Sequence, residues 1–99
     1  YSEVVNVLVG SLDKYALGQN YPNPFNPSTT IGYILKDKSN VKLSVFNSLG
    51  EEIAILVNGQ QEQGYYEVNF DAAGLPSGIY YYMINTGNFT QTKKMLLIK

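Results

Sequence analysis

The apolar residues of this chain recur at every second position, and this period restricts the possible folds more than any other feature of the sequence. In residues 65–71, Tyr66, Val68 and Phe70 alternate with acidic and amide side chains, and residues 41–47 repeat the pattern. Successive side chains of a strand point to opposite faces, so such a segment buries one face and leaves the other in water. No long window keeps the helical period of about 3.6 residues. The sequence therefore predicts an all-β fold.

Further strands are predicted where β-branched and aromatic residues gather between turns. These segments are residues 31–35, 51–57, 79–86 and 89–98. Residues 3–9 form either another strand or the tail of whatever precedes the domain. Two turns place a glycine where a hairpin needs a positive φ, at Gly50 and Gly87.

The predicted strands are short and regularly spaced. The loops between them are residues 36–40, 58–64 and 72–78, and they are polar or glycine-rich, as in a β-sandwich. A chain of 99 residues fits one domain. We predict an immunoglobulin-like antiparallel β-sandwich of about six to seven strands. Residues 79–84 are apolar on both faces, so this strand is expected to be central or covered. The last strand has the same character and should pack or pair more extensively than an ordinary edge.

Residues 19–27 have the most unusual chemistry of the chain, because prolines occupy three of these positions. Proline lacks a backbone N–H and pushes the preceding residue toward extended geometry, so this segment is stiff and cannot be a central strand. We expect it to lie along a sheet edge or to cap one end of the sandwich, with Tyr21 and Phe25 as two apolar anchors. A structural brace and a recognition surface are both open interpretations.

The composition removes most catalytic and metal-binding chemistries. The chain has no histidine, cysteine or tryptophan, and its seven basic residues are all lysine. It therefore lacks the usual acid–base group at neutral pH, the thiolate nucleophile, the preferred zinc ligands and the arginine forks that clamp phosphate. The chain has seven basic and eight acidic residues and therefore lacks the excess positive charge that is typical of nucleic-acid-binding proteins. No apolar run is long enough for a membrane span. We expect no catalytic residue, no metal and no cofactor.

Tyrosines support the second functional hypothesis, a non-catalytic carbohydrate-binding or spacer module of a secreted enzyme. Five tyrosines gather in two predicted strands and could form an aromatic platform for sugars: Tyr65, Tyr66, Tyr80, Tyr81 and Tyr82. Tyrosine is also a favoured strand residue, so packing in the core is the simpler interpretation.

Four stretches of the chain follow one another in a recognisable order. They read LGQNYPNPFNPSTTIGY at 17–33, VKLSVFNSLGEEIAILV at 41–57, GYYEVNFDAAGLPSGIYYYMI at 64–84 and TKKMLLIK at 92–99. Together they resemble the type A C-terminal sorting domain of the type IX secretion pathway. The resemblance covers most of the chain, and the order of the motifs makes it more specific than any one of them.

The resemblance implies a sorting signal at the end of a Gram-negative cargo protein, typically from the Bacteroidetes, and not an enzyme. The cargo would pass through the periplasm and then through the outer-membrane translocon, which recognises this domain. A sortase-like peptidase would cut upstream of the domain, and the cargo would end at the outer-membrane surface or be secreted. The implied partners are the translocon, this peptidase and a covalently attached N-terminal cargo domain.

The resemblance also assigns recognition to three motifs. Their residues are Pro22, Asn23, Pro24 and Phe25 in the first, Gly78 and Tyr80 in the second, and Lys93, Lys94 and Lys99 in the third. The physical role of the lysines stays open. Residues 89–99 contain no acid, and this positive patch either guides docking to an acidic receptor or protects an edge strand from aggregation.

The sorting domain itself is expected to span residues 15–99. Residues 1–14 are then a linker or the tail of a preceding domain, or they hold a first strand. Within them, a short polar interval is a possible cleavage region for the peptidase, since an exposed segment before a domain is a preferred site of proteolysis. Its residues are Gly10, Ser11, Leu12 and Asp13.

Overall fold

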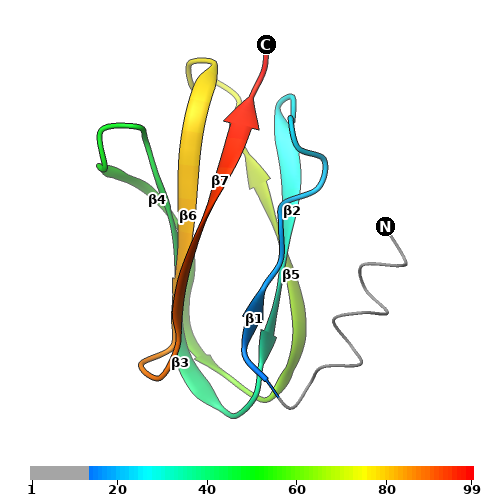
Figure 1. The fold of residues 1–99 in the computed structure, drawn as a ribbon, viewed down its shortest axis with the longest axis vertical. Helices are drawn as coiled ribbons and strands as arrows, with labels where there is room; N and C mark the ends of the chain where they lie inside the picture. Colours follow the sequence, from blue (N-terminus) through cyan, green and yellow to red (C-terminus); the bar gives the residue numbers. More distant parts are fainter. Residues whose placement is uncertain (1–13) are drawn as a thin grey trace.

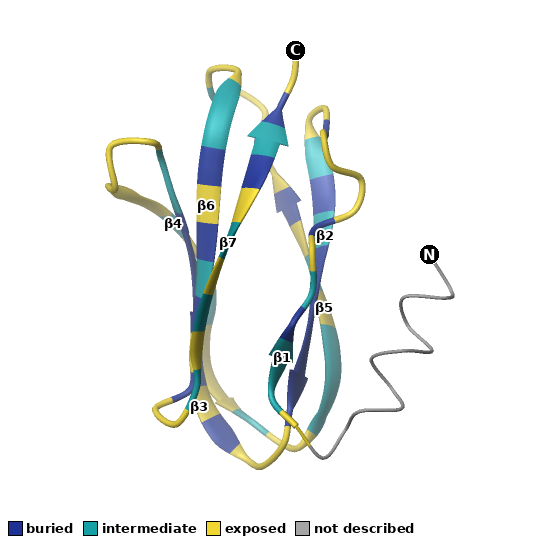
Figure 2. Cartoon of the chain, in the orientation of Figure 1, coloured by how far each residue is buried: buried dark blue, intermediate teal, exposed yellow. Residues whose placement is uncertain are grey.

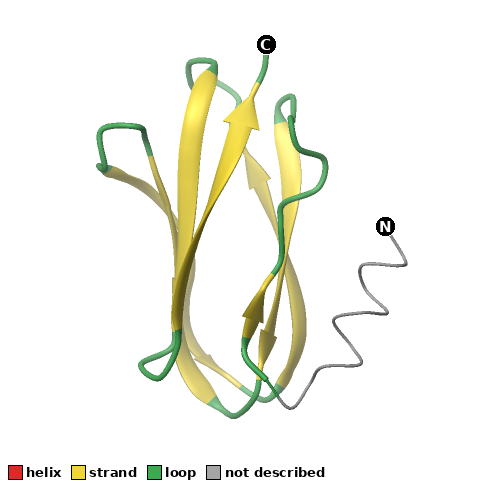
Figure 3. Ribbon diagram, in the orientation of Figure 1, coloured by secondary structure: helices red, strands yellow, loops and turns green. Residues whose placement is uncertain are grey.

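The computed structural model describes residues 14–99, which form two antiparallel β-sheets packed face to face (Figure 1). The strands are β1 (Ala16–Leu17), β2 (Ser28–Leu35), β3 (Ser39–Phe46), β4 (Glu52–Gln61), β5 (Gly64–Asp71), β6 (Gly78–Asn85) and β7 (Thr90–Leu97). Residues 14–99 contain strands and loops and no helix, hence no helix that could cross a membrane (Figure 3). The predicted all-β class is confirmed.

The strand order shows that the sandwich is immunoglobulin-like. One sheet has the order β1-β2-β5, and the other has the order β4-β3-β6-β7. Immunoglobulin domains place strands A, B and E in one sheet and strands C, F and G in the other, with C′ beside C in the variable type. Read along the chain as A, B, C, C′, E, F and G, the seven strands here follow that division. The predicted architecture is therefore confirmed.

The core lies between the sheets and is built by the two-residue period of the strands. Its most deeply buried large side chains are Phe25, Ile31, Tyr33, Leu35, Val41, Leu43, Val45, Tyr82, Ile84, Met95 and Leu97. Buried and exposed residues follow each other as bands along β6 and β7 (Figure 2). Burying a large apolar side chain contributes about 1.5–3 kcal/mol relative to leaving it in water. This burial fixes which face of each strand points inward.

The strand that is apolar on both faces occupies the predicted position. β6 lies between β3 and β7, so neighbours on both sides cover its flanks. The outward face of β3 departs from the expectation of a wet surface, because Ser44 is buried there. Ile55 of β4 and Met83 of β6 are its cross-strand partners and flank it on the two sides.

Two predicted boundaries were wrong in the same way. Residues 58–61 were expected to be loop but continue β4, and Ser39 and Asn40 belong to β3. These polar residues pair with each other, Ser39 opposite Gln61 and Asn40 opposite Gln60. Backbone pairing needs no apolar side chain, so the ladder extends beyond the alternating pattern that marks a strand in the sequence.

Both predicted hairpins are present. The turn after β3 closes with a hydrogen bond from the Gly50 amide to the Asn47 carbonyl at 3.0 Å, and Gly50 has a φ of 85°. Gly87 has a φ of 91° in the turn between β6 and β7. Such positive values are easy for glycine and rare for other residues. β1 was not predicted, and the predicted segment 3–9 lies outside the described residues.

Candidate functional site

The proline-rich residues 19–27, which we call the strap, lie along the outer edge of β7. The Phe25 amide donates to the Leu96 carbonyl at 3.0 Å, and the Ile98 amide donates to the Phe25 carbonyl at 3.0 Å. These two bonds form a parallel bridge between Phe25 and Leu97. The expected edge position is confirmed, and two motifs about 70 residues apart in the sequence become one surface.

Side-chain amides extend this pairing where prolines cannot. The Leu96 amide donates to Asn23 Oδ1 at 3.0 Å, and Gln19 Nε2 donates to the Lys94 carbonyl at 2.9 Å. A strand with prolines cannot supply a full ladder of N–H donors, so amide side chains take over part of that role. Asn23, assigned to recognition by the resemblance, thus has a structural bond through its side chain.

Asn20 shapes the strap from within, although it is not among the residues that the resemblance assigns to recognition. Its side chain is buried and donates through Nδ2 to the Pro22 carbonyl at 3.1 Å and to Thr29 Oγ1 at 3.0 Å. Thr29 Oγ1 in turn donates to the same carbonyl at 2.8 Å. Asparagine commonly satisfies nearby backbone groups in turns, and the run of asparagines beside prolines is the sequence signal for this role.

Only one of the two predicted apolar anchors is an anchor. Phe25 is 2% exposed, and its ring lies 6.2 Å from that of Phe70 at a tilt of 58°. Tyr21 is 58% exposed, which corrects the expectation that its ring is buried. Backbone bonds with Thr30 in both directions, each of 2.9 Å, hold Tyr21 in place. Its backbone is thus fixed while its ring remains largely in solvent.

The glycine-x-tyrosine motif forms a brace at the start of β6. Tyr80 is buried, and its hydroxyl donates to the Pro76 carbonyl at 2.6 Å. This is the tyrosine corner of immunoglobulin-like domains, in which a tyrosine near the start of strand F bonds the backbone a few residues upstream. Gly78 pairs with Leu97, the bridge partner of Phe25. All three motifs therefore meet at one end of the sandwich.

Tyr82 joins the two sides of the sandwich through its hydroxyl. The hydroxyl donates to the Gly18 carbonyl at 2.7 Å and accepts from the Asn20 amide at 2.8 Å. Its side chain is fully buried. Burial raises the pKa of Tyr82 well above its usual range, although the bond from the Asn20 backbone opposes that rise. The hydroxyl stays protonated and fixes the start of the strap to β6.

Replacing Tyr82 by phenylalanine tests this link. The variant keeps the ring but leaves the Asn20 amide and the Gly18 carbonyl without their partner, so we expect the free energy of unfolding to fall by about 1–3 kcal/mol. Chemical denaturation of the purified domain measures this loss. Tyr81→Phe is the matched control, because Tyr81 is exposed and should lose less than about 0.5 kcal/mol. Equal losses in the two variants would contradict the role of the Tyr82 hydroxyl.

The lysines that the resemblance assigns to recognition lie beside the strap. Lys94 and Lys99 are exposed and Lys93 is half-buried. Within residues 14–99, the ion pairs are Lys38 with Glu62 and Lys42 with Glu52, so these three lysines have no acidic partner there. A set of unpaired positive charges is available for a partner molecule, and salt would weaken its effect because exposed charges are screened.

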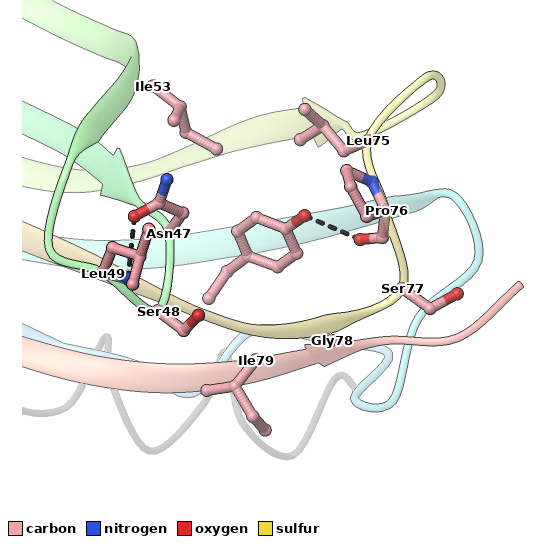
Figure 4. A pocket seen from close by; sticks show the side chains of 10 residues that line it. Asn47, Ser48, Leu49, Ile53, Leu75, Pro76, Ser77, Gly78 and Ile79 are labelled. Atoms are coloured by element: carbon pink, nitrogen blue, oxygen red, sulfur yellow. Dashed lines mark hydrogen bonds between the residues drawn. The ribbon is translucent and has the colours of Figure 1, made fainter.

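A pocket of about 280 Å³ opens next to the tyrosine corner, between the β3–β4 turn and the loop before β6 (Figure 4). It is lined by Asn47, Ser48, Leu49, Ile53, Leu75, Pro76, Ser77, Gly78, Ile79 and Tyr80. Its polar groups are amide, hydroxyl and backbone groups, and the Tyr80 hydroxyl is already bonded to Pro76. No group of three or more potential metal ligands occurs in the described part of the chain.

The tyrosines do not form the proposed sugar platform as a set. Tyr80 and Tyr82 are buried, as the packing interpretation predicted, and their hydroxyls bond to backbone carbonyls. Tyr66 stacks on Tyr33 with ring centres 5.4 Å apart. Tyr65 donates to Glu67 at 2.7 Å. Of the five tyrosines, Tyr81 alone is exposed.

Comparison with known proteins gives a family match and a structural match. A family model described as "Secretion system C-terminal sorting domain" matches residues 19–99, which include all nine residues that the resemblance assigns to recognition. No curated protein sequence matches. Among solved structures, dimeric latent PorU from Porphyromonas gingivalis is similar at a TM-score of 0.63 and 16% identity, covering 86% of this chain and 9% of that one.

Two further solved structures are similar. PorZ, an essential bacterial surface component of the type IX secretion system of Porphyromonas gingivalis, has a TM-score of 0.54 and 20% identity over 93% of this chain and 12% of that one. The Ig1 domain of mouse SynCAM 2 has a TM-score of 0.41 and 12% identity over 72% of this chain and 80% of that one. The chain thus spans a small part of the PorU and PorZ chains, with which it shares the fold.

Proposed function

Because the chain belongs to the type IX secretion system C-terminal sorting domain family, we propose that it directs an attached N-terminal cargo domain through the outer-membrane translocon of that pathway. The family acts as a sorting signal and is not catalytic. We infer that this domain is likewise a signal and not an enzyme, and that its cargo travels through the periplasm to the cell surface or the medium.

One observation carries the proposal. The proline-asparagine strap, the glycine-x-tyrosine step and the lysine-rich end meet at one end of the sandwich, where Gly78, Leu97 and Phe25 are bridged in a row. The buried members of the motifs hold this surface in shape, and the exposed ones are available to a partner. The exposed or half-exposed set is Pro22, Asn23, Pro24, Lys93, Lys94 and Lys99. We propose that the translocon contacts this set.

We also propose that the domain begins at residue 15 and that a sortase-like peptidase cuts upstream of it, at Gly10, Ser11, Leu12 or Asp13. The cleavage region lies outside the described residues. Contacts of Tyr15 support the boundary. Its ring stacks on Phe89 at 5.6 Å, and its hydroxyl lies 3.2 Å from Ser39 Oγ. Residue 15 is thus packed against the sandwich, and a cut before it would leave the domain whole.

An export assay tests the proposed function. Residues 1–99 are fused behind a fluorescent protein that carries a periplasmic signal peptide, in a bacterium with type IX secretion. We expect fluorescence at the cell surface or in the medium, and none there in a translocon mutant. Cleavage is then located by mass spectrometry of the released cargo. Retention of a folded fusion in the periplasm of the wild-type host, where a native sorting domain is exported, would contradict the proposal.

A further inference from the structure

Within residues 14–99, the strap covers one half of the outer edge of β7 and leaves the other half open. In an antiparallel ladder the backbone groups of alternate residues point away from the neighbouring strand. The Leu96 amide and carbonyl and the Lys94 carbonyl bond to the strap, so they point away from β6. By the same two-residue period, the backbone groups of Thr92 and Thr90 also point outward.

The other half of this edge has no hydrogen-bonded neighbour in the described part of the chain. Among residues 14–99, no hydrogen-bond partner contacts the outward backbone groups of Thr90 and Thr92 or the amide of Lys94. The side chains of all three residues are exposed. The strap reaches this edge no further than the Lys94 carbonyl, through Gln19. A row of unpaired N–H and C=O groups is a template for an additional strand.

The charge at this half-edge indicates what kind of strand fits. Lys93 and Lys94 lie on successive positions of β7 and therefore point to its opposite faces. Neither has an acidic partner in the described part of the chain. A second copy of β7 placed edge to edge would bring lysines against lysines, which is unfavourable. An extended segment with acidic side chains would instead place opposite charges on both faces.

We propose that the open half of the β7 edge, Thr90 to Lys94, accepts an extended acidic segment of an export-machinery protein by β-strand addition. The inference rests on the proposed function, because it specifies how a protein of the export machinery recognises and binds the domain. Main-chain hydrogen bonds supply affinity in this mode of recognition, and side chains on alternate positions supply specificity. The strap sets one limit of the docked strand, and the turn between β6 and β7 sets the other.

A titration with a synthetic peptide tests the proposal. The probe is a short blocked peptide that repeats Val-Glu-Glu-Val, so that a docked strand carries glutamates on both faces, and it is added to isotope-labelled protein of residues 1–99. We expect NMR shifts and slower hydrogen exchange at the amides of Thr90, Thr92 and Lys94. A peptide with lysine in place of glutamate should bind at least about tenfold more weakly. No binding, or shifts that map to β4 or β5, would overturn the proposal.

Two variants separate the backbone pairing from the charge. Thr92→Pro removes an outward N–H that bonds to nothing in residues 14–99, so it should keep the fold but weaken peptide binding at least about tenfold. Lys94→Glu should weaken it similarly and reduce its salt dependence. Lys38→Glu makes the same change in net charge in the exposed loop before β3 and should leave binding unchanged. If folded Lys94→Glu binds as tightly as the wild type, the proposal fails whether or not Thr92→Pro folds.

Export of the same variants distinguishes this inference from the proposed function. If the wild-type fusion is exported and Lys94→Glu is exported at the same rate, the strand-addition proposal is wrong while the sorting function stands. If the wild-type fusion is not exported in a host that exports a native sorting domain, the sorting function itself fails. We expect the wild type to be exported and both edge variants to accumulate in the periplasm.

Discussion

Deleting residues 93–99 from a full precursor is expected to leave the cargo in the periplasm. The deletion removes Met95 and Leu97 from the core and takes away Leu96 and Ile98, to which the strap is bonded. Cargo activity in periplasmic, surface and medium fractions measures the effect, which we expect to be a nearly complete loss of export. Normal secretion of the truncated precursor would contradict a sorting role for this end of the chain.

A second variant is needed to interpret that deletion, because it damages the fold as well as the signal. Replacing Lys93, Lys94 and Lys99 together by glutamine keeps every buried side chain of β7 and removes only the positive charge. If recognition depends on the lysines, this variant stays folded but is exported poorly. If they only protect an edge from aggregation, export of the folded variant persists while its solubility falls.

The sequence was sufficient to predict six of the strands, apart from their exact ends, and the position of β6 between two others. The alternation of apolar and polar residues along β5 and β3 determines which face of each strand is buried. A shift of the strand register by one residue would expose every apolar side chain to solvent. The apolar residues on both faces of β6 predicted its place between two other strands. The prolines predicted an edge position for residues 19–27. Each of these properties depends on residues that are close together in the sequence.

Contacts between residues far apart in the sequence could not be predicted in this way. Asn20 and Tyr82 are 62 positions apart and meet through one hydrogen bond. The local patterns predicted packing for Tyr82 and suited Asn20 to a turn, but neither indicated that the two residues meet. Tyr21 shows a different limit, since its aromatic ring in a proline-asparagine segment suggested an apolar anchor, but the residue is mostly exposed to solvent. β1 was missed because two residues are too few to show a period.

The motifs that the resemblance assigns to recognition contain residues with two different structural roles. Tyr80 and Phe25 are buried and bonded within the domain, so their first effect is on its shape. The lysines and the outer residues of the strap are exposed beside them. Each motif region thus combines exposed residues, which we call the surface, with buried residues such as Phe25 and Tyr80, which hold that surface in shape and which we call the support. Mutations in the support should therefore impair export through stability, and mutations in the surface should impair it without loss of stability.

Phe25→Ala is the sharpest test of the support. Phe25 contacts Phe70 in the core and bridges to Leu97, and its side chain is 2% exposed. Truncating a buried phenylalanine typically costs about 3–5 kcal/mol. A domain of this size has a free energy of unfolding of only about 5–15 kcal/mol. We therefore expect the variant to be partly or largely unfolded, and the strap to separate from β7.

Denaturant unfolding followed by circular dichroism measures this loss, and hydrogen exchange at the amides of Leu96 and Ile98 reports on the strap directly. Leu49→Ala is the control, because Leu49 is 83% exposed in the β3–β4 turn and its truncation should change stability by less than about 0.5 kcal/mol. A Phe25→Ala domain as stable as this control, with the two amides still protected, would mean that the strap is held by its hydrogen bonds and that the buried ring contributes little.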